Sequence, residues 1–134
     1  MKVFVSYRYT GESREELDRV MPEVCDVLKS AGYSHYCSLF DSDQFESEKW
    51  SGKRILQKAF SEIDSSDAVL FFVRSPEVSQ GMLVELGYSL AKKKKLVLLI
   101  QRAVKESIFR RQIDTVVEFE SMSDLKDKLV NLKL

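Results

Sequence analysis

The stretch SQGMLVELGYSLA, residues 79–91, decides the fold of this chain, and it comes after the run AVLFFV at residues 68–73. Six consecutive apolar residues are typical of a buried strand. Ser79 is suited to cap a helix, because its hydroxyl can accept a hydrogen bond from a free backbone N–H of the first turn. The two segments therefore predict a buried strand followed by a helix.

Helical spacing places four residues of this stretch on one face, namely Leu83, Leu86, Gly87 and Leu90. We expect this face to lie on a sheet. Glycine within a helix costs about 1 kcal/mol relative to alanine, so Gly87 indicates a close approach of the helix to a strand. By the same reasoning, Gly81 indicates a close approach of the backbone to a ligand.

Glu85 lies beside this apolar face, and no Lys or Arg lies within one helical turn of it in the sequence. Two interpretations are open. A half-exposed helical glutamate needs no special role, because Glu has a good helix propensity. Alternatively, a carboxylate near a helix N-terminus, at the carboxyl end of a parallel strand, faces the crevice in which open α/β sheets bind ligands. There it could act as a nucleophile.

Strand-like runs alternate with helical patterns along the rest of the chain. An acidic, polar segment at residues 41–49 is expected to be a loop. The expected strands are residues 2–6, 33–40, 67–73, 96–100 and 116–119. The expected helices are residues 14–30, with a kink or late start at Pro22, a second from Ile55 to Ile63, residues 79–91, a short helix or loop through Arg111, and residues 121–132.

This alternation predicts an α/β fold. We expect a flavodoxin-like or Rossmann-like three-layer sandwich with a five-stranded parallel sheet in the order 2-1-3-4-5. In that order the switch point lies between the first and third strands. The loop after strand one and the helix that carries Glu85 then meet at one crevice, where we expect the ligand.

The composition excludes several classes of protein. The formal net charge of the 134 residues is zero, so nothing favours a nucleic acid polymer or an anionic membrane as partner. We expect one domain, residues 1–134. Cys25 and Cys37 form no CxxC pair and are expected to be reduced thiols, which indicates a reducing compartment. Without a signal peptide or a long apolar segment, we expect a cytoplasmic protein.

No cofactor is expected. His35 is the single histidine and has no metal-ligand spacing around it, so no metal site is predicted. The chain also lacks the Gly-rich phosphate loops that bind nucleoside triphosphates or dinucleotides.

The pattern Gly-Met-x-x-Glu-Leu-Gly-Tyr-x-Leu-Ala, which begins at Gly81 and precedes lysines and a new apolar strand, carries a resemblance. It resembles the signature of the nucleoside 2-deoxyribosyltransferase family, including its hydrolytic branch, the 2′-deoxynucleoside 5′-phosphate N-hydrolases. The resemblance implies a small-molecule nucleotide or nucleoside as substrate. It also implies that Glu85 attacks the anomeric carbon as the base leaves, and a carboxylate suits the oxocarbenium-like sugar of such a reaction.

The resemblance further implies a phosphate site. In the family, the position six before the catalytic Glu is Asp where the substrate is a free nucleoside and Ser in the nucleotide hydrolases. Ser79 therefore resembles the monophosphate branch, since Ser at a helix N-terminus can donate to a phosphate that Asp would repel. The loop after strand one would bind phosphate through Arg8 and Gly11, with Tyr7 or Tyr9 packing on sugar or base.

Ser107 falls where the nucleotide hydrolases of the family place a Ser that reaches the phosphate in the neighbouring subunit's site. If this position carries over, the protein is a homodimer or higher homo-oligomer with shared active sites.

One position departs from the family. Its members usually have an Asp that assists proton transfer to the base. This Asp lies eight positions before the family residue that corresponds to Asp67. This chain has Ala59 there. The departure puts the activity in doubt, and three acidic residues are candidate substitutes, namely Asp41, Asp43 and Glu46.

Two other functions stay open. Residues 3–8, together with Ser75 and Pro76 ahead of Glu85, also resemble the TIR domain, whose members cleave NAD or act as assembly modules. TIR domains usually have Trp-Cys shortly before that Glu, where this chain has Gly81 and Met82. Ala59 motivates the other alternative, a non-catalytic nucleotide-binding or protein-interaction module.

Overall fold

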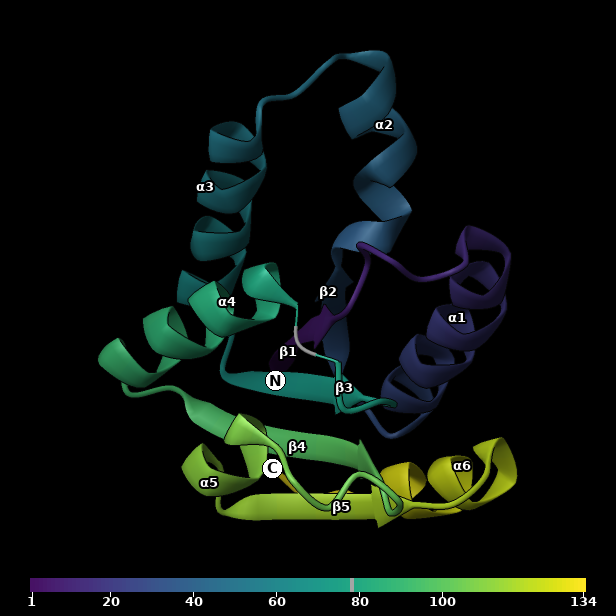
Figure 1. Ribbon diagram of the computed structural model, residues 1–134. Helices are drawn as coiled ribbons and strands as arrows, with labels where there is room; N and C mark the ends of the chain where they lie inside the picture. The colour runs from purple at the N-terminus through teal and green to yellow at the C-terminus, as the bar shows by residue number, and fades with distance from the viewer. Residues whose placement is uncertain (78) are drawn as a thin grey trace.

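The computed structural model describes residues 1–77 and 79–134, and its centre is a parallel sheet (Figure 1). The sheet has five strands in the order β2-β1-β3-β4-β5, which confirms the predicted α/β fold and strand order. The strands are β1 (Lys2–Tyr7), β2 (Ser34–Cys37), β3 (Ala68–Val73), β4 (Lys95–Gln101) and β5 (Thr115–Phe119).

Helices cover both faces of the sheet and complete the three layers. Helices α1 and α6 pack on the face that carries Val5, and α3, α4 and α5 pack on the face that carries Phe4. Since side chains alternate along a strand, Ser6 also points to the α4 face. The helices are α1 (Arg14–Ser30), α2 (Ser42–Ser47), α3 (Gly52–Asp64), α4 (Gln80–Ala91), α5 (Ile108–Gln112) and α6 (Met122–Val130).

The ends of the helices follow local chemistry that the sequence displays. Ser79 accepts a backbone N–H group at the start of α4, which confirms it as the cap, and Ser121 caps α6 in the same way. Gly32 has φ +94° just after α1, a left-handed conformation that glycine adopts readily, and the helix ends at Ser30, the predicted residue. The alternative of a late start at Pro22 is wrong, because α1 runs continuously from Arg14.

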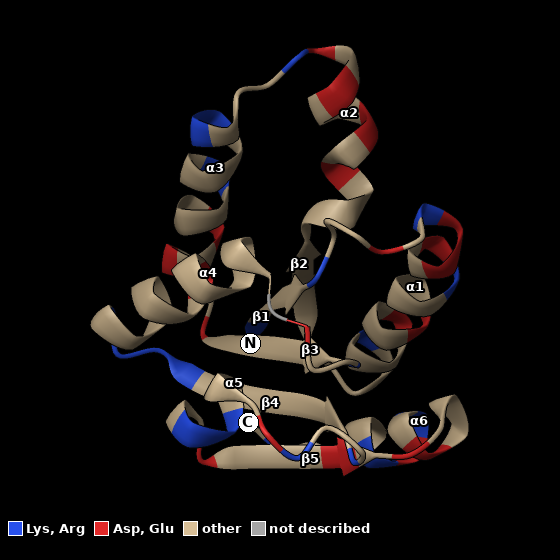
Figure 2. Cartoon of the chain, in the orientation of Figure 1, with Lys and Arg blue, Asp and Glu red and all other residues tan. Residues whose placement is uncertain are grey.

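The segment after β2 differs from the prediction. The strand ends at Cys37 instead of residue 40, a 3₁₀ turn (Ser38–Asp41) follows, and the expected loop contains α2. Leu39 and Phe45 are buried and anchor the turn and the helix to the protein. Acidic residues lie all along α2, as Figure 2 shows, and they masked the sparse apolar spacing from which this helix could have been predicted.

The orientation of α4 also differs from the prediction. Its buried residues are Met82, Leu86 and Ser89, whereas Gly87 and Leu90 are exposed. A Cβ atom built on Gly87 would meet no atom within 4 Å, so this glycine makes no close approach to a strand. The reason is that α4 is apolar on nearly every side, so its periodicity could not decide which face meets the sheet.

Candidate active site

Glu85 and Ser6 form the centre of the candidate site. Ser6 lies near the end of β1 and is 1% exposed. Its Oγ donates a hydrogen bond to Oε1 of Glu85 over 2.7 Å. Helix α4 carries Glu85 across the end of the neighbouring strand, so two residues that lie 79 positions apart in the chain meet.

The carboxylate of Glu85 has no cationic partner within the described residues. Burial raises the pKa of Glu85 to about 7, and the hydrogen bond from Ser6 opposes this rise. At neutral pH the side chain is therefore divided between the carboxylate and the carboxylic acid. A group with this balance is suited to attack a carbon atom or to exchange a proton.

Glu85 faces a cavity of about 180 Å³ that brings together four of the predicted site residues. Tyr7, Ser79 and Gly81 line it with Glu85. The hydroxyl of Tyr7 shares a hydrogen bond of 3.2 Å with Ser38, and burial raises the pKa of Tyr7, so the phenol stays protonated. The cavity therefore combines one titrating carboxyl group with neutral hydroxyl groups.

The start of α4 provides polar groups at the same cavity. Ser79 Oγ accepts the Met82 N–H over 3.3 Å, which leaves its own hydroxyl hydrogen available to a ligand. A Cβ atom on Gly81 would meet only Ser79 Oγ, at 3.7 Å. Gly81 therefore leaves open space beside Ser79, as expected for a place where a ligand approaches the backbone.

A smaller cavity of about 20 Å³ adjoins the first one, because Tyr7 and Met82 line both. It contains the predicted Arg8, whose Nη1 lies 3.2 Å from Glu12 and whose Nη2 lies 2.7 Å from Glu77. Arg74, which the sequence analysis missed, also lines it. Arg74 pairs with Glu12 over 3.2 Å and with Glu16 of α1 over 2.9 Å, so the ion pairs extend to α1.

The backbone conformation and the surroundings of Gly11 explain why glycine occupies this position. Its φ is +84°, and a Cβ atom there would come within 2.5 Å of Nη2 of Arg8. A larger residue would therefore displace the guanidinium group from its place. Gly11 is not among the residues that line these cavities, so it acts on the site through Arg8.

A third cavity, of about 220 Å³, continues from the Glu85 cavity toward α2. Both are lined by Tyr7, Tyr9, Ser38 and Ile55. The third cavity is lined on the side of α2 by Ser42, Phe45 and Glu46. The Glu85 cavity shares lining residues with both of the others, and we refer to the three neighbouring cavities together as the cleft, with Arg8 at one end, Glu85 in the middle and Glu46 at the other end.

Ser107 does not line this cleft. It caps α5, where its Oγ accepts the Phe109 N–H over 3.2 Å. The contact of Ser107 with a phosphate in a neighbouring subunit stays a prediction.

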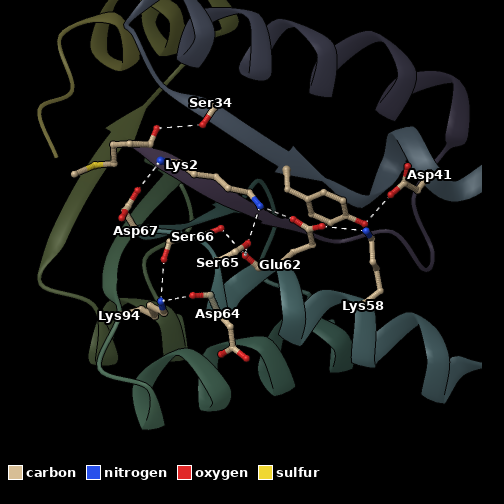
Figure 3. Close-up of polar contacts among 12 residues, drawn as sticks. Lys2, Ser34, Asp41, Lys58, Glu62, Asp64, Ser65, Ser66, Asp67 and Lys94 are labelled. Carbon is tan, nitrogen blue, oxygen red and sulfur yellow. Dashed lines mark hydrogen bonds and ion pairs between the residues drawn. The ribbon is translucent and has the colours of Figure 1, made fainter.

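The cleft receives no second carboxylate from α3, either at Ala59, where the family has Asp, or from Glu62, one helical turn further on. Ala59 is 7% exposed and packs in the core between α3, α4 and the sheet. Glu62 binds Lys2 over 2.6 Å and Lys58 over 3.0 Å (Figure 3). Burial alone would raise the pKa of Glu62, but the two lysines outweigh it and lower this pKa. Glu62 is therefore a structural, ionised residue at the opposite end of β1.

Two broader features of the described residues bear on the kind of protein. No three or more His, Cys, Asp or Glu side chains gather there in a way that could hold a metal ion. Among the same residues, no helix has both the length and the apolar character that crossing a membrane requires. Cys25 and Cys37 are buried free thiols, as expected.

Several residues of the cleft were not found from the sequence. Ser6 carried no signal, because its role depends on α4 crossing the end of β1. Arg74 had one available signal, since it directly follows a buried strand whose end the fold places at the ligand crevice. Glu77 is placed by the same loop and pairs with Arg8.

Comparisons with known proteins agree with this geometry. The family model of nucleoside 2-deoxyribosyltransferase matches residues 10–132. No curated protein sequence matches the chain.

Solved structures show the same fold at low sequence identity. A CMP N-glycosidase from Clostridium botulinum has a TM-score of 0.72 and 16% identity, over 96% of this chain and 97% of that one. A 2-deoxyribosyltransferase from Bacillus psychrosaccharolyticus has a TM-score of 0.67 and 20% identity, over 95% and 91%. A third similar structure, from Leishmania mexicana, is also a deoxyribosyltransferase, with a TM-score of 0.60 and 15% identity over 82% and 69%.

Proposed function

Because the chain belongs to the nucleoside 2-deoxyribosyltransferase family, we propose that it cleaves the N-glycosidic bond of a nucleoside 5′-monophosphate with Glu85 as nucleophile. The observation that carries this proposal is the state of Glu85. Its side chain is half-buried in the middle of the cleft, and among the described residues its carboxyl group has no cationic partner and accepts a hydrogen bond from Ser6. A surface glutamate without a role would be solvated or paired instead.

In the proposed reaction, the ionised Glu85 attacks the anomeric carbon of the sugar. The bond between that carbon and the base nitrogen breaks, its electron pair leaves with the base, and the base takes up a proton. A covalent glycosyl ester on Glu85 remains and divides the reaction into two easier steps. Water then releases the sugar phosphate, or a second base forms a new nucleotide, and in either case Glu85 is regenerated.

The order of groups along the cleft supports a monophosphate. With the sugar at Glu85, the phosphate would lie toward Ser79 and the two arginines, Arg8 and Arg74. The base would then lie between aromatic side chains toward α2. The similar protein from Clostridium botulinum is a CMP N-glycosidase, so this fold is compatible with a nucleotide substrate.

The arginine end of the cleft is not ready to receive an anion. Two arginines meet three carboxylates there, those of Glu12, Glu16 and Glu77. Glu77 is the most exposed of the three, with 67% of its side chain accessible. We propose that the phosphate displaces Glu77 from Arg8, since a guanidinium group binds phosphate through similar paired hydrogen bonds.

The test is release of free base, measured by chromatography. Ribo- and deoxyribonucleoside monophosphates, free nucleosides and NAD are each incubated with the wild-type protein and with Glu85→Ala. Base released from monophosphates by wild type alone is the expected result. Release from nucleosides only would contradict the roles of Ser79 and Arg8, and nicotinamide from NAD alone would favour the TIR-like activity. No release from any compound would contradict the proposed reaction and agree with an activity lost at Ala59.

We also propose that the protein is a homodimer or higher oligomer. The exposed face of α4 carries Val84, Gly87, Leu90 and Ala91 and no charged residue, and Figure 2 shows this helix almost without charge. Such a face is typical of an interface. The expected mass by light scattering is at least twice that of the chain, and Val84→Lys should reduce it. A wild-type monomer would contradict the shared site inferred for Ser107.

A further inference from the structure

An acidic residue without a role in the proposed reaction lies at the end of the cleft toward α2, where the base would bind. Glu46 lies on α2 and lines the third cavity with Phe45, Tyr9 and Ile55. Phe45 is 8% exposed and lies against Trp50, with ring centroids 4.7 Å apart, so this part of α2 is anchored to the protein. The position of Glu46 at the cleft is therefore set by a buried neighbour.

The other acidic residues of this segment are already engaged. Asp41 accepts a hydrogen bond from the Tyr36 hydroxyl over 2.9 Å, and Asp43 accepts one from Arg14 over 3.2 Å. Within the described part of the chain, the carboxylate of Glu46 takes part in no hydrogen bond or ion pair. Of the three acidic residues that could take over from the missing Asp, the structure thus leaves Glu46 available to a ligand.

We propose that Glu46 selects the leaving base by accepting a hydrogen bond from an exocyclic amino group. This inference rests on the proposed function, which places the sugar at Glu85 and the base toward α2. An ionised carboxylate can only accept hydrogen bonds, so it matches the amino group of a cytosine-type or adenine-type base. The keto oxygen of a uracil-type or hypoxanthine-type base would face it with lone pairs and leave both acceptors unsatisfied.

Equilibrium binding tests this selection without requiring turnover. Cytidine and uridine 5′-monophosphates differ at the base edge in question and share every other group. They are titrated calorimetrically into Glu85→Gln and into the double variant with Glu46→Gln. With Glu46 present, the cytidine nucleotide should bind at least about tenfold more tightly, since a hydrogen bond to a charged group is worth roughly 1.5–3 kcal/mol. Glu46→Gln should bring the ratio close to one, because an amide can also donate to a keto oxygen.

Asp43→Asn in the same background is the matched control. It neutralises an acidic residue of the same helix that pairs with Arg14 and does not line the cleft, so the ratio should stay unchanged. Adenosine and inosine 5′-monophosphates provide a second pair with the same expected result. Circular dichroism of each variant shows whether the fold is retained.

Three results would overturn the proposal for Glu46: no binding of any of these nucleotides, no preference for the amino-bearing nucleotide, or a preference that survives Glu46→Gln. Failure of the proposed function has a different signature. A preference that depends on Glu46, together with no base release by the wild-type protein, would leave Glu46 as a base-recognition residue of a binding protein. Base release without a preference would retain the reaction and remove the role of Glu46.

Discussion

Two glutamates at opposite ends of β1 are in contrasting environments. Glu62 lies at the amino end of the strand between Lys2 and Lys58, which lower its pKa (Figure 3). Glu85 lies at the carboxyl end, where burial raises its pKa to about 7 and, of the residues that the structure describes, Ser6 alone donates a side-chain hydrogen bond to it. The difference shows that burial alone does not make a carboxylate reactive. The cationic partners decide whether it stays ionised or can change its protonation state near neutral pH.

The largest expected effect is on catalysis. Glu85→Gln keeps the shape of the side chain and removes the nucleophile, so base release should fall by at least about 10³-fold. Glu62→Gln makes the same chemical change at the other end of β1 and should leave the rate within about threefold, because Glu62 does not line the cleft. Initial rates of base release measure both. Equal losses in the two variants would remove the functional distinction between these residues.

The second effect concerns stability. The pKa of Glu85 is about 7 in the folded protein against an ordinary value of 4.5, so ionisation of Glu85 opposes folding. This cost is absent below about pH 4.5 and complete above about pH 7. Glu85→Gln removes it and should raise the free energy of unfolding at pH 8 by up to about 3 kcal/mol, with little gain at pH 4.5. Urea denaturation at the two pH values measures the difference.

Glu62→Gln should change stability in the opposite sense. The lysines lower the pKa of Glu62, so its ionised form favours folding at neutral pH, and this contribution is lost as the pH falls through the folded-state pKa. The variant should lose about 1 kcal/mol at pH 8 and almost nothing in acid. Two variants that both destabilise the protein at pH 8 would show that Glu85 also has a structural role.

The features of the fold and of the site that could be predicted are those that local sequence patterns determine. The five strands and their order followed from apolar runs alternating with helices, because local patterns carry this information. Glu85 could be found because the residues around it form a recognisable pattern. The sequence could not show which face of α4 is exposed, since the exposed residues are as apolar as the buried ones. Helix α2 was missed because Phe45, the buried apolar residue that anchors it, is surrounded by acidic positions.

The partners of residues that make distant contacts could not be predicted from the sequence. Ser6 acts on a residue 79 positions away, and Arg74 meets Glu12 across 62 positions. The pairing of Glu62 with Lys2 spans 60 positions and likewise gives no signal in the sequence. In each case the partner is set by how strands and helices lie side by side, which single-residue patterns do not encode.

The smallest expected effect tests the hydrogen bond from Ser6 to Glu85. Ser6→Ala removes the hydrogen bond that opposes the rise of the Glu85 pKa, so the pH at which the nucleophile ionises should move upward. A hydrogen bond of this kind is worth roughly 0.5–1.5 kcal/mol, which predicts a rate about two- to tenfold lower at pH 7. Above pH 8.5, where Glu85 is ionised in both proteins, the two rates should converge. The pH profile of base release therefore separates two roles for Ser6. Convergence at high pH means that Ser6 sets the ionisation of Glu85, and an equal loss at every pH would mean that it only holds the side chain in place.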